Sequence, residues 1–306
     1  MKKTEKRATI VSVCAKSVHQ SNSLSRNMCF VDNISTLNKN QLLILTFLAS
    51  KVRRDDFTFE KIAIKPSTLS LILNINLEDR ETRNRFKKDV IELAGKRMVI
   101  QHKDSKSFIS APFFSWCQYD DENYQYIFKL NECMAPYYLG FSENSPRTIF
   151  KFGYIRMLPS VYSRRLYMIA ASIKNLAGGV AYTIEKLYAV LGYTDQTRNF
   201  GSRVLTKAML DINALTDITL QAFAIKEGRK VIGYIFKSRA KSKDFMDIQE
   251  IYPAELPDSR SERERIKSLY KDPDGVIDGE VIIKHIQYRD LTPKQQTAMR
   301  ENEIIG

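Results

Sequence analysis

The chain of 306 residues has few of the side chains on which metal and redox chemistry depend. Its three histidines lie far apart and form no HxH or HExxH pair that could supply a metal ligand set. Its four cysteines lack CxxC spacing, so neither a zinc site nor a disulfide framework is expected, and a reducing cytoplasm is the simpler location. Phosphate loops of the form GxxxxGKS/T and GxGxxG turns are also absent, which argues against an ATPase or a dinucleotide enzyme. We therefore expect no cofactor, no metal and no catalytic site.

Long apolar runs and acidic residues are scarce as well. The most apolar run, residues 41–50, is far shorter than the roughly 20 residues that a membrane span needs, so no membrane partner is expected. Lys and Arg number 48 against 35 Asp and Glu, which gives a formal net charge of +13. This charge favours a polyanionic partner, most often nucleic acid, although some proteins are basic only for solubility. A hydrophobic content of 43% is typical of a globular chain, and the length allows two domains with separate cores.

Residues 158–241 have the sequence pattern of a winged helix. Three helical patterns precede two alternating strands that flank the basic turn KEGRK, residues 226–230. The helices are expected at 158–176, 182–193 and 199–218, and the strands within 219–241. In such a unit the third helix enters a DNA groove and the hairpin lies beside it.

The residues before 145 show a similar order. The predicted elements are a helix at 37–52, a strand at 57–64, helices at 66–75 and 81–94, and strands at 97–103, 107–120 and 124–130. Phe57 and Phe59 alternate along the first strand. Pro66 suits the first turn of its helix, because backbone N–H groups make no hydrogen bonds within the helix there and the N–H that proline lacks is not needed. We expect Gly95 to end the third helix in the left-handed conformation.

The fold class predicted from these patterns is α+β, with two tandem winged-helix domains and a partly ordered C-terminal tail. The predicted boundaries are 1–145 for the first domain, 146–241 for the second and 242–306 for a C-terminal appendage. The polar stretch 141–148 contains Pro146 and is interpreted as the linker. The appendage is rich in charge and proline, which indicates partial order.

The third helix of the second domain supplies the main candidate DNA-reading face. On a helical wheel its core side holds Phe200, Val204, Leu205, Ala208 and Ile212. The opposite side holds Asn199, Ser202, Arg203 and Thr206, with Arg198 and Lys207 at the flanks. No acidic residue occurs from 198 to 210, and Arg can bind the two acceptors of guanine in a bidentate manner. The simpler alternative is a solvated helix face.

Two further basic surfaces are candidates for contact with the DNA backbone. In the third helix of the first domain, Phe86, Val90 and Leu93 are expected to point inward. The outward set is Arg83, Asn84, Arg85, Lys87 and Lys88. Nearby Asp89 and Glu92 reduce the positive charge, so this helix is expected to contact phosphates more than bases. In the wing, Lys226, Arg229 and Lys230 are expected to contact the backbone or a minor groove, although basic hairpin turns also serve solubility alone.

Four segments carry a resemblance to a known family. LPSVYSRRLYMIA (158–170) is similar to an LkSxYSxRLYELL segment, and NFGSRVLTKAMLDINALTDITL (199–220) to an FxxxVLxxAxxEINxxTDI stretch. GRKVIGYIF (228–236) is similar to a GRKVxxIxF wing strand, and SVHQSNSL (17–24) to a VxxSNxL lead-in. All four patterns are those of the iteron-binding plasmid replication initiators, the Rep family. Pro159, Met168 and Asp211 depart from the family's usual Lys, Glu and Glu, but none belongs to the candidate DNA-facing set.

The resemblance implies a sequence-specific protein that binds double-stranded DNA in the bacterial cytoplasm, associated with a plasmid or the nucleoid. In that family, monomers bind direct repeats at the origin, open the adjacent duplex, and recruit the host replication initiator and helicase. A dimer formed mainly through the first domain binds an operator inverted repeat and represses its own gene. Chaperones are further candidate partners of the protein, and they would act on this monomer–dimer equilibrium. The aromatic side chains Phe108, Phe113, Phe114 and Trp116 lead us to expect the dimer contact within residues 105–130.

Two alternatives remain open from the sequence. The chain could be a winged-helix transcriptional regulator without a role in replication. It could also be a DNA-nicking enzyme that uses one of its fifteen tyrosines, although no cluster of His and Arg accompanies them. Tyrosines that pack in two cores are the simpler interpretation.

Overall fold

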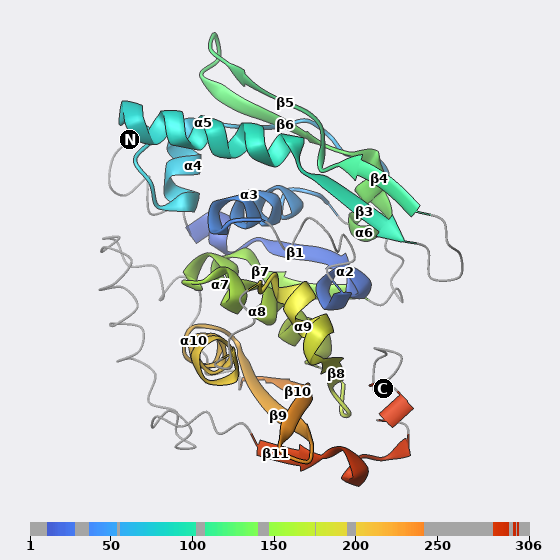
Figure 1. Ribbon diagram of the computed structural model, residues 1–306. Coiled ribbons are helices and arrows are strands. Elements are labelled where there is room, and N and C mark those ends of the chain that lie inside the picture. The colour runs from blue at the N-terminus through green and yellow to red at the C-terminus, as the bar shows by residue number, and fades with distance from the viewer. Residues whose placement is uncertain are drawn as a thin grey trace. The chain divides into compact units, whose positions relative to one another are not determined.

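The computed structural model of the chain forms two compact units (Figure 1). Among the described residues, the first unit contains those up to Arg156 and the second those from Met157 onward. The structure describes residues 11–27, 37–53, 56–101, 108–139, 147–174, 176–194, 200–241, 284–293, 296, 297 and 299. None of the helices within these ranges is long and apolar enough to cross a membrane.

The first unit is built around one helix that is buried on every side. Its elements are β1 (Ser17–Ser21), α2 (Asn22–Asn27), α3 (Lys39–Ala49), β2 (Ile62–Ile64), α4 (Pro66–Leu73), α5 (Arg80–Gly95), β3 (Arg97–Gln101), β4 (Phe108–Pro112), β5 (Phe114–Asp120), β6 (Gln125–Leu130), η1 (Glu132–Met134), α6 (Ala135–Tyr138), β7 (Arg147–Lys151) and α7 (Phe152–Met157). Every residue of α3 from Gln41 to Ala49 is buried, because β1, α4 and α5 pack around the helix. Asn38 caps its first turn, and the Gln41 side chain accepts a hydrogen bond from the Asn38 N–H.

The order of α3, β2, α4, α5 and the β5–β6 hairpin confirms the predicted first winged helix. The three strands form a sheet in the order β2-β6-β5, and β3 and β4 form a separate two-stranded ladder. Helix α5 lies alongside the β5–β6 hairpin (Figure 1), and the rings of Phe86 and Tyr126 meet edge to face at 5.1 Å. The predicted inward set is confirmed, since Phe86, Val90 and Leu93 are all buried.

Two local predictions in this unit are wrong. Gly95 does not adopt the left-handed conformation: α5 runs through it, and Lys96 then turns directly into an extended conformation that begins β3. A left-handed residue instead ends α4, where Asn74 has a φ of 54°. The strand predicted at 57–64 begins only at Ile62, and Phe57, which precedes it, is 87% exposed.

The first unit also extends beyond the predicted boundary at residue 145. β7 pairs antiparallel with β1, so Arg147 lies opposite Ser21 and Lys151 opposite Ser17. Part of the predicted linker at 141–148 is therefore strand, while residues 141–146 lie outside the described residues. The pairing of β7 with β1 carries the chain back into the first unit before it enters the second.

The second unit is a winged helix with one additional strand. Its elements are α8 (Val161–Ile173), β8 (Val180–Thr183), α9 (Ile184–Leu191), η2 (Phe200–Leu205), α10 (Thr206–Leu215), β9 (Ile218–Glu227), β10 (Lys230–Ala240), β11 (Lys284–Gln287) and η3 (Tyr288–Asp290). The sheet order is β11-β9-β10-β8. Residues 242–283 of the predicted appendage lie outside the described residues, but β11 belongs to the sheet of the second domain, which corrects the prediction of a separate tail.

Two arginines of the YSRRLY segment hold the core of the second unit together. Arg164 and Arg165 on α8 are both fully buried. Arg164 donates its Nε hydrogen to the carbonyl of Leu158, and Arg165 donates to the carbonyl of Leu191, the last residue of α9. Burial lowers the pKa of Arg165 to about 10, so the guanidinium still carries its charge at neutral pH. Arg165 therefore connects α8 to the C-terminal end of α9, and Arg164 fixes the segment that leads into α8.

Candidate nucleic-acid interface

An aromatic cluster supports the start of the third helix in the second unit. Phe200 is 2% exposed, and its ring centroid lies 4.7 Å from that of Tyr188 and 4.9 Å from that of Tyr193. Tyr234 of the wing strand β10 lies behind it at 6.4 Å. Burial, with a smaller contribution from Tyr188, raises the pKa of Tyr234 to about 12, so its hydroxyl remains protonated. This rigid support determines the direction in which the chain after Phe200 leaves the core.

The first turn of the third helix is a π-helix and not the continuous α-helix that the sequence predicts. η2 is π-helical over Phe200–Leu205, and α10 begins at Thr206. The Thr206 hydroxyl donates a hydrogen bond to the Gly201 carbonyl at 2.8 Å. A Cβ on Gly201 would lie 2.9 Å from the Tyr234 hydroxyl oxygen, so a larger residue here would require Tyr234 or the turn to shift. π-helical turns are rare and are frequently found at functional sites.

The exposed side of this turn carries part of the predicted DNA-reading set. Ser202, Arg203 and Lys207 are exposed, and Thr206 is half-buried. The predicted core side is confirmed for Phe200, Leu205, Ala208 and Ile212, which are all at most 2% exposed. Val204, which lies within the π-helical turn, is only half-buried, so the prediction is wrong for this residue. Arg198 and Asn199 lie outside the described residues.

The wing presents its cations at the tip of the β9–β10 hairpin. Gly228 has a φ of 61°, a left-handed conformation that the tight turn requires. Arg229 and Lys230 are exposed, whereas Lys226 is half-buried. Exposed Glu227 lies among them and reduces the local positive charge.

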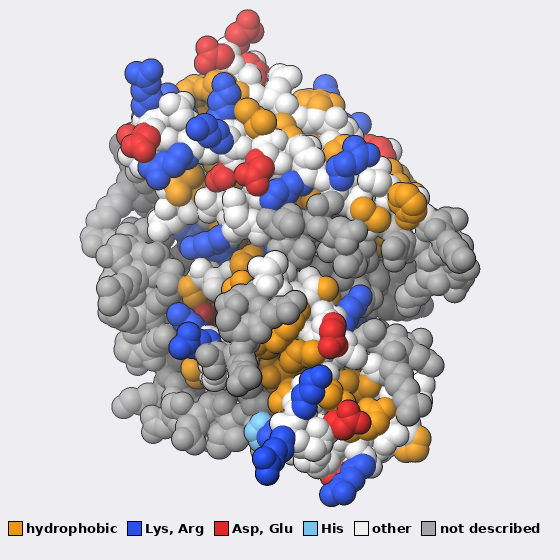
Figure 2. Space-filling model, viewed as in Figure 1, with side chains coloured by type: hydrophobic (Ala, Val, Ile, Leu, Met, Phe, Trp, Pro, Cys, Tyr) orange, Lys and Arg blue, Asp and Glu red, His pale blue; other side chains and the backbone are white. Residues whose placement is uncertain are grey.

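Helix α5 of the first unit presents a more balanced surface. The residues Arg83, Asn84, Arg85, Lys87 and Lys88 are all exposed, as predicted. Arg85 lies 3.6 Å from Glu81, and Arg83 donates to the carbonyls of Leu77 and Glu78. Figure 2 shows Lys and Arg side chains interspersed with Asp and Glu over the upper part of the view, where α5 and the β5–β6 hairpin lie. Lys87 and Lys88 are therefore better placed than Arg83 and Arg85 to contact phosphate.

One basic residue was missed by the sequence analysis. Arg289 lies in η3, directly after β11, with 86% of its side chain exposed. The sequence held a signal for this element, since VIIKHIQY at 281–288 is rich in β-branched residues. The high charge and the prolines of the surrounding tail favoured partial order instead, so no strand was predicted there. Within the described residues, no group of His, Cys, Asp or Glu could hold a metal ion.

Comparisons with known proteins agree with this architecture. A family model described as initiator replication protein, WH1, matches residues 17–171, and one described as initiator Rep protein, WH2, matches residues 183–238. A crystal structure of the Pi initiator protein in complex with iteron DNA matches with a TM-score of 0.59 and 15% sequence identity. That match covers 76% of this chain and 99% of the other, and at this identity it concerns the fold alone. No curated protein matches the chain.

Proposed function

The chain belongs to the initiator replication protein family, and we propose that it initiates plasmid replication by binding repeated double-stranded DNA sequences at the origin. The two family matches include the YSRRLY and wing segments and confirm the resemblance that these segments carry. The structural relative bound to iteron DNA supports this type of target. In the proposed role the chain needs no catalytic residue, because binding energy is converted into bending and opening of the duplex.

The observation that carries the proposal is the exposed polar surface of the π-helical turn. Ser202, Arg203 and Lys207 are exposed, while Phe200 behind them is buried in an aromatic cluster. A rigid support beneath short polar and basic side chains is what reading of base edges requires, because side chains must meet the bases without loss of conformational freedom. Arg203 is proposed to bind a guanine, with Ser202, Thr206, Arg198 and Asn199 contributing neighbouring contacts.

The other basic surfaces are proposed to hold the DNA backbone. Arg229 and Lys230 at the wing tip are exposed and would contact phosphate beside the groove that the third helix enters, with Lys226 behind them. Lys87 and Lys88 of α5 are proposed to position the first winged helix on the same duplex. Two winged helices in one chain would then cover a site of about two helical turns.

The biological cycle that we propose follows the family. Monomers bind direct repeats, open the neighbouring duplex, and recruit the host replication initiator and helicase. A dimer binds an inverted repeat and represses the gene. Chaperones would shift the balance between the two forms.

The proposal can be tested with the DNA that flanks the gene. We expect this DNA to contain several direct repeats of about 20 base pairs, two helical turns each, and the full chain to bind them more tightly than a scrambled duplex. A plasmid that carries only this DNA and the gene should replicate in the host, whereas the same plasmid with scrambled repeats should be lost.

Other outcomes would identify the rival functions. Tight binding to the flanking DNA without replication of the plasmid would identify a transcriptional regulator. A covalent protein–DNA adduct on supercoiled plasmid in the presence of a divalent metal would identify a nicking enzyme. Either result would contradict the proposal.

A further inference from the structure

The C-terminal strand is an integral part of the wing sheet although it lies outside both family matches. The family models end at residue 238, whereas β11 covers Lys284–Gln287. β11 pairs parallel with β9, so that Lys284 lies opposite Phe223 and Gln287 opposite Lys226. The outer edge of β9 is therefore covered by the chain itself over residues 223–226, which protects this part of the edge from pairing with another molecule.

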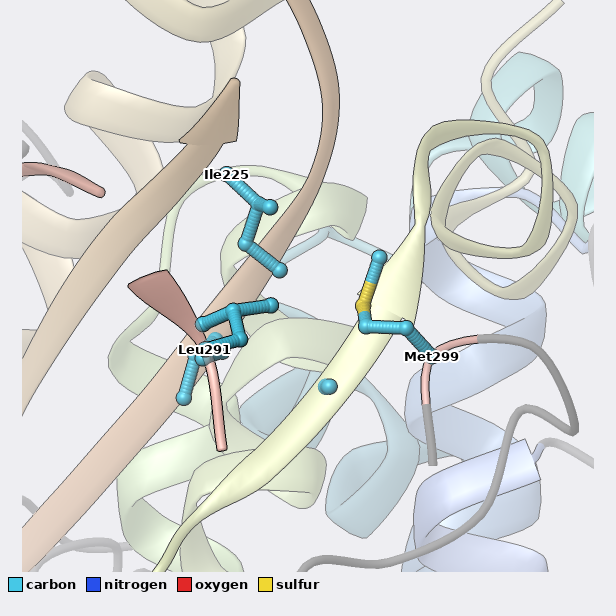
Figure 3. Close-up of a cluster of buried hydrophobic side chains, with 5 residues drawn as sticks. Ile225, Leu291 and Met299 are labelled. Carbon is cyan, nitrogen blue, oxygen red and sulfur yellow. The ribbon is translucent and has the colours of Figure 1, made fainter. Parts of the chain in front are cut away.

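Apolar side chains anchor this segment on the face of the sheet opposite the helices. The strand register places Tyr234 beside Ala224 on the face that packs against Phe200, and Ile235 beside Phe223 on the other face. On that second face Leu291 and Met299, at 5% and 3% exposure, form a buried cluster with Ala181, Ile225 and Ile235. Figure 3 shows this cluster, with Ile225, Leu291 and Met299 labelled.

Gly233 supplies the space that one of these anchors uses. It lies on the same face, next to Ile225 in the register of β9 and β10. A Cβ on Gly233 would lie 2.6 Å from the Met299 Cε and 2.3 Å from the Tyr182 carbonyl oxygen. The sheet is therefore shaped for close contact both with its neighbouring strand and with the C-terminal segment.

The direction of β11 places its C-terminal end, and η3 after it, at the wing tip. Because β11 runs parallel to β9, it advances toward the hairpin turn, and η3 follows where β9 reaches Lys226. Tyr288 of η3 lines a surface pocket together with Glu227 and Lys230 of the turn. The neighbouring Arg289 is exposed, and its contact with Asp290 at 3.8 Å is long and solvent-accessible, so it constrains Arg289 little.

We propose that β11 and η3, anchored by Leu291 and Met299, brace the wing as a third strand with its following turn, and that Arg289 is a DNA-backbone contact beside Arg229 and Lys230. The proposal rests on the proposed function, since it assumes that the wing tip faces DNA. Because Leu291 and Met299 are anchored, the backbone at Arg289 is already positioned before DNA binds. The contact with phosphate then costs little further conformational entropy. A segment outside the family models thus adds one cation to the phosphate-binding surface.

The test is the salt dependence of binding to a short random-sequence DNA duplex, measured with the full chain by fluorescence anisotropy. Each phosphate contact contributes about 0.9 to the slope of log Kobs against log salt concentration. We expect Arg289→Ala and Lys230→Ala each to remove one phosphate contact and so to reduce the magnitude of the slope by about 0.9. Arg239→Ala is the matched control, because Arg239 is an exposed arginine at the other end of β10 and should leave the slope unchanged.

A second variant separates a direct contact from a general effect of charge, because it leaves the net charge unchanged. Leu291→Asn should release the segment from the apolar face and reduce the slope by the same amount as Arg289→Ala. Adding Arg289→Ala to Leu291→Asn should then have no further effect, because the arginine has already left the interface. If the two slope reductions were instead additive in the double variant, the proposal that the segment braces the wing would be overturned.

The outcomes also separate this inference from the proposed function. An unchanged slope for Arg289→Ala, together with a reduced slope for Lys230→Ala, would overturn the inference and leave the proposed function standing. Failure of the wild-type chain to bind any duplex would overturn the proposed function itself.

Discussion

Gly201 and Tyr234 are in close contact across the second winged helix: a Cβ on residue 201 would lie 2.9 Å from the Tyr234 hydroxyl oxygen. Gly201 belongs to the π-helical turn that precedes α10, and Tyr234 is a buried residue of the wing strand β10. Tyr234 cannot easily move away, because its ring packs against Phe200 and Phe236. The contact therefore couples the wing sheet to the turn that carries Ser202 and Arg203.

Gly201→Ala should destabilise the second unit and weaken DNA binding. A methyl group in a packed site typically costs about 1–3 kcal/mol of the free energy of unfolding. Gly95→Ala is the matched control, because it lies in helix α5 and nothing lies within 4 Å of its Cβ position. That change should stabilise the chain by about 0.4–1 kcal/mol through the lower entropy of the unfolded state. Thermal unfolding of both variants measures the difference, and equal shifts would contradict the contact.

Arg165→Met should lower the free energy of unfolding without altering contacts with DNA. The change removes the charged donor to the Leu191 carbonyl, which typically costs about 1.5–3 kcal/mol. Arg165 is fully buried, so the salt dependence of duplex binding should equal that of the wild type when measured well below the unfolding temperature. A reduced salt slope with unchanged stability would instead place this arginine in the interface.

Arg203 and the wing lysines should differ in how they affect specificity. Arg203→Ala should cost about 1–3 kcal/mol of binding to the target repeat and relax the preference at one base pair. Replacement of Lys226 and Lys230 by Ala should weaken binding to all sequences alike and lower the salt slope by about one per lost contact. Competition between target and random duplexes measures both effects. Equal losses on the two duplexes for Arg203→Ala would show that Arg203 binds phosphate only.

The order of elements could be predicted from the sequence because it follows from short-range periodicity. Helix α5 shows this well: Phe86, Val90 and Leu93 recur at helical spacing and all three are buried. Local chemistry was less informative. Gly95 was expected to end that helix in the left-handed conformation, but the strand that follows determines the exit of the chain, and Lys96 is extended.

Long-range pairing could not be predicted from periodicity. β7 belongs to the first unit because it pairs with β1, more than a hundred residues earlier, and β11 belongs to the second because it pairs with β9. Nothing within either short strand specifies its partner. The π-helical turn was not predicted either, and the close approach of Gly201 to Tyr234, which lies more than thirty residues later in the chain, is likewise not visible in local periodicity.

The structure narrows the part of residues 105–130 that is available for the predicted dimer contact. Phe113 and Phe114 are core residues with at most 2% exposure, whereas Phe108 on β4 is 65% exposed and Ile109 is 40% exposed. Among the described strands, β4 pairs only with β3, so its other edge offers backbone groups to a second copy. The proposed dimer contact is therefore narrowed to β4.

The position of Arg97 decides which substitution tests this contact. Ser110→Asp would place a carboxylate beside Arg97, whose guanidinium already donates to the Ser110 side chain and carbonyl. Part of the introduced charge would be neutralised there, so Ser110→Asp should favour the monomer only weakly. Phe108→Asp removes apolar surface and adds an unpaired charge to the same strand, and it should favour the monomer more strongly.

The test is the mass distribution in sedimentation velocity, with Phe57→Asp as the matched control. Phe57 is a phenylalanine of the same unit that is 87% exposed but lies outside every strand, so its replacement should leave the monomer–dimer balance unchanged. Phe108→Asp should shift the balance toward monomer and raise binding to direct repeats relative to an inverted repeat. An unchanged mass distribution for Phe108→Asp, or an equal shift for Phe57→Asp, would remove β4 from the dimer contact.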